Sequence, residues 1–197
     1  MATPSSRRLG AADSQTRARL LDAAERLLLE DGYAAVTSRR VGAAAGLKPQ
    51  LVHYYFQTMD DLFVEVFRRR ADESLEHFAR AVAADPSLHT LWRLNADPRG
   101  AALMIEFAAL ANHRKSIRAE IARYAERSRA AQIDALTAGL ADAGVTPDVM
   151  PPMAALLLMT GVSQIIGIER ALGVTAGHDE TMAFIEQAVA RLEAPIR

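Results

Sequence analysis

The segment from Thr37 to Phe56 constrains the fold of this chain more than any other stretch. Its first half, TSRRVGAAA, carries apolar residues at helical spacing behind a threonine that can cap a helix. Gly46 then stands where a helix C-terminus needs a left-handed residue, and Pro49 suits the first position of a following helix. The segment therefore predicts two short helices joined by a tight turn, which is a helix-turn-helix.

The second of these helices, from Pro49 to Phe56, has an apolar and a polar face. Leu51, Val52 and Tyr55 lie with Phe56 on adjoining rows that can be buried. The opposite face carries side chains that can hydrogen-bond to base edges, which are Gln50, His53, Tyr54 and Gln57. A helical hairpin with a merely solvated face is the alternative interpretation of this pattern.

The absence of acidic residues around this hairpin favours the first interpretation. No Asp or Glu occurs from Gly32 to Met59, and a surface without carboxylates does not repel phosphates, which usually dominate DNA affinity. Backbone N–H groups at the start of the first helix can also meet phosphates. The sequence therefore predicts a DNA contact surface made of Thr37, Ser38, Arg39, Lys48, Pro49, Gln50, His53 and Tyr54.

The stretch TSRRVGAAAGLKPQLVHYYFQTMDDL, Thr37 to Leu62, resembles the tetracycline-repressor (TetR-like) family of bacterial transcriptional regulators. The resemblance covers about the first third of the chain, and the rest is similar only in length and helical character. It implies a homodimeric repressor that binds a palindromic operator and is released by a small-molecule effector. Three residues depart from the family pattern of a small capping residue, a Tyr and a phosphate-binding Lys, and they are Lys48, His53 and Met59.

The rest of the chain also predicts helices and no strands, so the expected fold class is all-α. Residues 1–57 should form a three-helix DNA-binding domain, in which residues 1–12 are a flexible arm and a helix runs from about Ser14 to Glu30. Residues 58–197 should form a helical effector-binding and dimerisation domain. The charge agrees, because residues 1–58 hold eight Lys and Arg against five Asp and Glu, and the remainder holds 15 against 19.

Five further helical stretches are expected after a long helix that Thr58 caps and Asp85-Pro86 ends. They are a short helix between Pro86 and Pro98, an apolar one over residues 101–111, an amphipathic one over about 115–143, an apolar one over 153–168, and a last one that Asp179 caps. Large apolar side chains of this domain could line an effector pocket between helices, with a few polar groups orienting the ligand. The candidates are Phe78, Trp92, Met104, Phe107, His113, Tyr124, Met159 and Gln164, although packed core is the alternative for each.

The stretch from Met153 to Ile168 is uncharged over sixteen residues, which falls short of the roughly 20 needed to span a membrane. The sequence therefore predicts no membrane partner. Because a helix that is apolar on several faces must be covered on several faces, a second subunit is the expected partner. The predicted homodimer interface comprises Leu157, Gly161, Ile165, Ile168, Met182, Ile185 and Val189, and the resemblance also implies a four-helix interface here.

The sequence lacks the motifs of common enzymes and cofactor sites, so neither catalysis nor a cofactor is expected. It contains no Cys, and its five His form no metal-binding pair, so no metal site is predicted and a reducing cytoplasm suits the chain. The DNA-bound protein would be associated with the nucleoid. An all-helical small-molecule enzyme and a dimeric interaction module that does not bind DNA remain the alternative functions.

Overall fold

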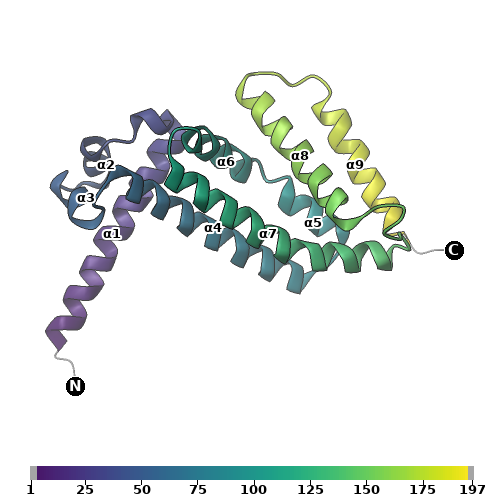
Figure 1. Cartoon of the computed structure of the whole chain (residues 1–197), viewed down its shortest axis with the longest axis horizontal. Coiled ribbons are helices and arrows are strands. Elements are labelled where there is room, and N and C mark those ends of the chain that lie inside the picture. Colours follow the sequence, from purple (N-terminus) through teal and green to yellow (C-terminus); the bar gives the residue numbers. More distant parts are fainter. Residues whose placement is uncertain (1–3, 195–197) are drawn as a thin grey trace. The chain divides into compact units, whose positions relative to one another are not determined.

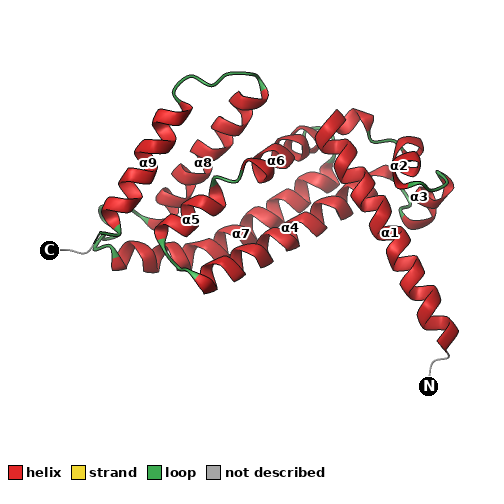
Figure 2. Ribbon diagram, turned by 180° about the vertical axis from the view of Figure 1, so that it is seen from behind, coloured by secondary structure: helices red, strands yellow, loops and turns green. Residues whose placement is uncertain are grey.

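The computed structural model describes residues 4–194, and the side chains of residues 4–13, 98 and 99 lie outside that description. Every regular element in this range is helical and none is a strand (Figure 2), which confirms the all-α class. The elements are α1 (Pro4–Asp31), the short 3-10 helix η1 (Tyr33–Ala35), α2 (Ser38–Ala45), α3 (Gln50–Tyr55), α4 (Met59–Ala84), α5 (Leu88–Asn95), α6 (Pro98–Ala111), α7 (Lys115–Asp142), α8 (Pro152–Ala171) and α9 (His178–Leu192).

The chain divides into two compact units. The first contains Met1–Arg70 and Glu106–Ile121, and the second contains Ala71–Ile105 and Ala122–Arg197. Three helices, α4, α6 and α7, therefore contribute residues to both units. The domain boundary between residues 57 and 58 stays a prediction; the first unit also takes in the beginning of α4 and the corner between α6 and α7.

The first unit is built around the apolar stripe of α1, which packs beside α2 and α3 (Figure 1). The apolar stripe of α1 is buried. Some residues of α2, of α3 and of the first turns of α4 are buried with it. Phe67 of α4 meets Phe107 of α6 edge to face, with ring centroids 4.9 Å apart. The buried side chains of this core include Leu20, Ala24, Leu27, Leu28, Val41, Val52, Phe56, Leu62, Phe63, Val66, Leu110 and Ile117.

Ion pairs fasten α1 to α4 beside this core. Arg69 donates to Asp22 at 2.6 Å and to Glu25 at 2.9 Å. Burial by itself would lower the pKa of Arg69, but the hydrogen bonds that it donates to Glu25 and Asp22 outweigh burial and raise the pKa. Arg70 is within 3.3 Å of the same Glu25. The first helix is therefore held to α4 by charges as well as by apolar packing.

The second unit has its own core between α5, α7 and α8. Leu88 and Leu91 of α5 pack with Leu136 and Leu140 of α7 and with Leu156 of α8. Gly139 of α7 lets α5 approach closely, because a Cβ there would lie 2.8 Å from a methyl carbon of Leu88. The five leucines thus form a closed apolar centre that anchors α8 to the rest of the unit.

Several predicted helix boundaries differ from those observed. Helix α6 begins at Pro98 and not at residue 101, and α8 continues to Ala171 beyond the predicted end at 168. The start at Ser14 is wrong, because α1 begins at Pro4; proline suits the first turn of a helix, and the alanines that follow have high helix propensity. Residues 1–3 of the predicted arm lie outside the described residues. The start of α3 differs by one position, because Pro49 has helical angles and forms the cap of a helix that begins at Gln50.

The predicted cap of the last helix is also wrong. Helix α9 begins at His178, with Gly177 as its cap, and Asp179 lies in the first turn. His178 is buried, and its Nε2 atom lies 2.6 Å from a carboxylate oxygen of Glu169 near the end of α8. This contact between the two helix ends moves the helix start ahead of the aspartate.

Candidate nucleic-acid interface

The two helices of the predicted helix-turn-helix, α2 and α3, are capped as their sequence indicates. The Thr37 hydroxyl accepts from the backbone N–H of Arg40 at 3.3 Å. Gly46 has φ 64° and ψ 35°, the left-handed conformation that ends α2. The Leu47 N–H then donates to the carbonyl of Gly42 at 2.8 Å, which closes the turn. These local interactions fix the direction in which α3 leaves α2.

Gly42 is a functional residue that sequence reasoning missed. It lies inside α2, where a Cβ would be 3.0 Å from the Leu47 carbonyl oxygen and 3.1 Å from two backbone atoms of Pro49. The neighbouring atoms belong to the backbone of the turn, so they cannot move aside as a flexible side chain would. A glycine within a helical pattern is the signal that could have revealed this close approach.

Two arginines of α1 hold the far end of α2, and sequence reasoning missed both. Arg19 donates to the carbonyl of Ala45 at 2.5 Å, and Arg26 donates to the carbonyl of Ala44 at 3.1 Å. The last carbonyls of a helix have no partner within the helix, so these guanidinium groups complete its hydrogen bonding. The orientation of α2 is therefore set by α1 as well as by the turn.

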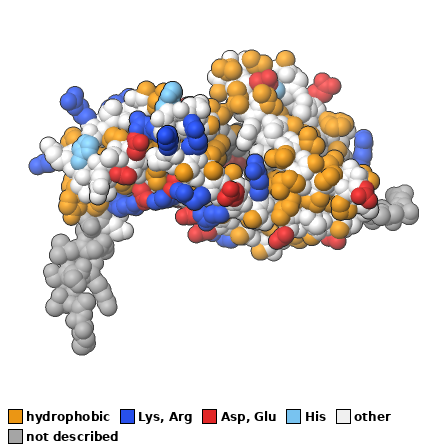
Figure 3. All heavy atoms as spheres, in the orientation of Figure 1, with side chains coloured by type: hydrophobic (Ala, Val, Ile, Leu, Met, Phe, Trp, Pro, Cys, Tyr) orange, Lys and Arg blue, Asp and Glu red, His pale blue; other side chains and the backbone are white. Residues whose placement is uncertain are grey.

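The predicted DNA contacts lie on the outer surface of this hairpin. Val52 and Phe56 face the core, and the polar row of α3 lies on the opposite side; Tyr54 is 73% exposed and meets Tyr55 edge to face. The left-hand tip in Figure 3, where α2 and α3 lie, shows basic side chains in blue and no acidic ones in red. The exposed members are Thr37, Arg39, Lys48, Gln50, His53 and Tyr54, and the half-buried ones are Ser38 and Pro49.

The acidic start of α4, next to this surface, is internally paired. Thr58 and Asp61 form a reciprocal cap, because the Asp61 N–H donates to the Thr58 hydroxyl and the Thr58 N–H donates to the Asp61 carboxylate. Asp60 forms an ion pair with Arg114, which also lies over the ring of Phe63. Both carboxylates therefore have partners within the first unit, and Met59 is half-buried beside them.

The effector-pocket candidates are distributed over both units. Phe107 and His113 belong to the first unit, and the other six belong to the second. Trp92 and Phe107 are fully buried, whereas His113 and Gln164 are exposed. The remaining four, Phe78, Met104, Tyr124 and Met159, are half-buried, and Phe78 and Met159 pack against the leucine core of the second unit. The lining of a pocket stays a prediction.

Sequence reasoning missed a polar network between α5, α7 and α8. The Asn95 amide donates to the Gln132 side chain at 2.9 Å, and Gln132 donates to the Ser128 hydroxyl at 2.8 Å. The Thr160 hydroxyl of α8 donates to the amide oxygen of Asn95 at 3.3 Å. The spacing of Ser128 and Gln132 on one face of α7 was the only sequence signal for this cluster.

The predicted dimer interface is exposed on α8 and half-buried on α9. Leu157 and Ile165 are each 50% exposed, and Ile168 and Gly161 are also exposed. Apolar side chains over α8 and α9 are visible in orange in Figure 3, and the large exposed ones of these helices outside the predicted set are Met153, Leu158, Phe184 and Leu192. Met182, Ile185 and Val189 are half-buried, and Val189 packs against the leucine core.

The glycines of α8 have different surroundings. A Cβ on Gly167 would lie 2.9 Å from the Cβ of Ala101, so this glycine serves a close approach of α6 within the chain. A Cβ on Gly161 would meet nothing within 4 Å. Gly167 therefore allows a close approach of two helices inside the subunit, whereas Gly161 leaves open space on the exposed face.

No group of three or more acidic, His or Cys side chains suited to a metal is found among the residues whose side chains are described. The hairpin is therefore the arrangement with the clearest chemistry in the first unit. It offers helix N–H groups, cations and an exposed row of donors and acceptors, and the stretch from Gly32 to Met59 contains no Asp or Glu. Such a surface can bind phosphates and hydrogen-bond to the edges of bases.

Comparisons with known proteins agree with this surface. Residues 20–66 match the family model of bacterial regulatory proteins of the tetR family. The HTH-type transcriptional regulator BetI of Rhizobium meliloti (strain 1021) is 28% identical over 122 residues. That alignment covers 57% of this chain and 60% of the relative, so the chain matches less than two thirds of the relative's length.

Solved structures share the fold along nearly the whole chain. A protein from Saccharomonospora viridis, solved in complex with choline, has a TM-score of 0.74 at 19% identity, covering 90% of this chain and 94% of that one. A TetR transcription regulator from Haloarcula marismortui ATCC 43049 has a TM-score of 0.71 at 20% identity, covering 91% and 96%. Residues 20–66 of this chain therefore match the tetR family of bacterial regulatory proteins, and the solved structures show that its fold extends over nearly the whole chain.

Proposed function

We propose that this protein is a ligand-responsive transcriptional repressor that binds a palindromic operator as a homodimer in the cytoplasm. The observation that carries the proposal is the exposed polar row of α3, which lies opposite the buried Val52 and Phe56 and is fixed by the capped turn before it. A helix presented in this way can enter the major groove. The match of residues 20–66 to the tetR family model supports the same assignment.

Phosphates and bases would be contacted by different residues of the hairpin. Thr37, Ser38 and Arg39 lie at the start of α2, where free N–H groups and a positive charge favour a phosphate. Gln50, His53 and Tyr54 would then reach base edges, with Lys48 on a base or a nearby phosphate. Phosphate contacts position the protein and base contacts give specificity, so the two groups should respond differently to substitution.

Gln50→Ala should weaken binding to the preferred operator by about 1–3 kcal/mol and relax the preference at one base position. The reason is that an amide can make two hydrogen bonds to one base edge, and alanine makes none. Selection from random DNA, followed by affinity measurement at fixed salt, tests this. Asn112→Ala removes an exposed amide outside the hairpin and is the matched control. A wild-type protein that enriches no motif would overturn the proposed function.

The second subunit would cover the exposed apolar face of α8 and α9. Helix α8 has the length and composition of a membrane-crossing helix, but its Leu156 packs in the leucine core and its Thr160 bonds to Asn95. The same helix exposes Leu157 and Ile165 on another face, which is the two-sided pattern of a helix between a core and a partner. A two-fold dimer would place the DNA-reading helices on half-sites about one helical turn, or a multiple, apart.

The effector is proposed to be a small, mainly apolar molecule that binds in the second unit and lowers operator affinity. It can do so only by preferring one arrangement of the DNA-reading heads, and α4 is the proposed lever because it contributes residues to both units. Support comes from the large side chains of Phe78 and Met159, which border the leucine core, and from the fully buried Trp92 of α5.

Thermal-shift screening should therefore find apolar ligands that raise the melting temperature and also weaken operator binding. Choline is a separate arm of the screen, because a structural neighbour was solved in complex with it. Trp92→Phe keeps an aromatic side chain and should alter ligand response without altering ligand-free operator affinity. Ligands that stabilise the protein but leave operator affinity unchanged would make it a regulator without this switch.

A further inference from the structure

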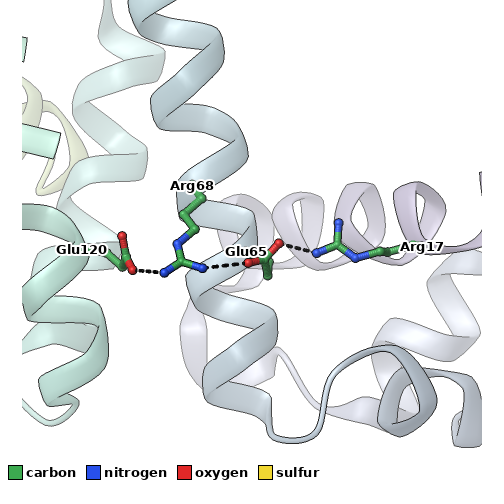
Figure 4. Close-up of polar contacts among 4 residues, drawn as sticks. All are labelled: Arg17, Glu65, Arg68 and Glu120. Carbon is green, nitrogen blue, oxygen red and sulfur yellow. Dashed lines mark hydrogen bonds and ion pairs between the residues drawn. The ribbon is translucent and has the colours of Figure 1, made fainter. Parts of the chain in front are cut away.

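A chain of charged side chains runs through the first unit from α7 to α1 (Figure 4). Glu120 of α7 accepts from Arg68 of α4, and Arg68 also donates to Glu65 at 3.1 Å. The other carboxylate oxygen of Glu65 accepts from Arg17 of α1. Negative and positive side chains alternate in this series, so each group is attracted by the group or groups next to it.

This series of ion pairs ends at Arg17, which contacts the end of α3, the helix proposed to read DNA. The guanidinium carbon of Arg17 lies 5.3 Å from the centroid of the Phe56 ring, within the range of a cation–π contact. Phe56 is buried and forms the C-terminal cap of α3, where its N–H donates to the carbonyl of Val52 at 2.9 Å. Arg17 therefore touches the residue that terminates the helix proposed to enter the groove.

Glu120, at the buried end of this series of ion pairs, has the least freedom to move. Glu120 is only 7% exposed, and a buried carboxylate without a compensating charge is costly. The hydrogen bond that Arg68 donates to Glu120 raises the pKa of Arg68, with a further contribution from the bond to Glu65. Because Glu120 fixes Arg68, and Arg68 directs Glu65 toward Arg17, the rotamers along the chain are set from the buried end. Exposed ion pairs without such an anchor contribute little.

We propose that Glu120 is a positioning residue for DNA reading, acting through Arg68, Glu65 and Arg17 on the end of α3. The inference rests on the proposed function for its effect on DNA, and on geometry alone for its effect on α3. Helix α7 runs from Lys115 to Asp142 and contributes residues to the second unit as well. A ligand that shifts α7 thus has a second route to α3, which passes through the side chains of Arg68 and Glu65 on α4 and does not require α4 itself to move.

The test uses Glu120→Gln, which keeps the shape of the side chain and removes its charge, and Arg17→Gln at the half-exposed end of the chain. Glu126→Gln, an exposed glutamate of α7, is the matched control. Amide hydrogen exchange in the full-length protein should speed up in residues 50–56 for both test variants and stay unchanged in residues 38–45. Operator affinity should fall about fivefold or more in each, the lower range for coupled sites, with an unchanged salt slope.

The double variant separates a relay from two unrelated defects. If the four side chains act as a unit, the losses of operator affinity are not additive. The double variant then binds the operator about as well as the single variant with the lower affinity. Additive losses, or faster exchange throughout the first unit, would reduce Glu120 to a stabilising residue and overturn the proposal. A salt slope lowered by Arg17→Gln would instead make Arg17 a phosphate contact, which also overturns it. Exchange confined to residues 50–56 in a protein that selects no operator would refute the proposed function and leave the relay intact.

Discussion

Gly42→Val is expected to abolish specific DNA binding and to leave the dimer and the helical content of the protein unchanged. The substituted Cβ would lie 3.0–3.1 Å from backbone atoms of Leu47 and Pro49, and valine adds two methyl groups beyond it. The turn must move away from α2 to make room, and α3 moves with it because Pro49 is its cap. Overpacking of this kind costs about 1–3 kcal/mol of stability, which displacement of the turn relieves.

The loss of binding should exceed the loss of stability. Each good bidentate contact to a base contributes about 1–3 kcal/mol of discrimination, so displacing the whole row of α3 removes several such contacts at once. Specific affinity should then fall to the level of non-specific binding, which fluorescence anisotropy with operator and scrambled DNA measures. Ala43→Val places the same side chain on an exposed position of the same helix and should bind normally. Equal operator affinity for the Gly42 and Ala43 variants would show that α3 does not depend on this contact.

The hairpin was predictable because its helix caps and its turn depend on residues that are close in the sequence. Thr37, Gly46 and Pro49 each have a conformational preference that depends on neighbours within one turn, and all three act in the structure as expected or within one residue of it. Helix existence was predictable for the same reason, since apolar spacing repeats within each helix. The start of α1 was missed because residues 4–12 carry no apolar stripe, although their alanines favour helix.

Contacts between distant residues were not predictable. Glu65 and Arg17 are separated by 48 positions, and nothing in a single sequence pairs one arginine of α1 with one glutamate of α4. Asp60 likewise forms an ion pair with Arg114, which lies in the turn after α6 and far along the sequence. The proposed DNA-reading surface could therefore be predicted from the sequence. The side chains that hold it in place could be identified only from the tertiary structure.

A substitution on the exposed side of α8 is the most direct test of the proposed dimer interface. Ile165 is 50% exposed in the single subunit, so an arginine there is solvated and should not disturb the fold. In a two-fold interface the same position occurs twice, and each copy would bury an unpaired charge. Breaking charge compensation in a buried site costs about 3–5 kcal/mol per site, which is enough to dissociate an ordinary dimer.

Ile165→Arg should therefore lower the mass measured by light scattering from twice the 21.4 kDa subunit to that of one subunit. Operator affinity should fall by about 10²–10⁴, because binding of the second head is no longer intramolecular. Affinity for a single half-site should stay nearly the same, since the hairpin is untouched, and circular dichroism should show the helices intact. Ala138→Arg adds the same charge to an exposed position of α7 and should remain dimeric with full operator affinity. A dimer of unchanged mass would remove Ile165 from the interface, whereas a monomer that keeps full operator affinity would show that one head reads the whole site.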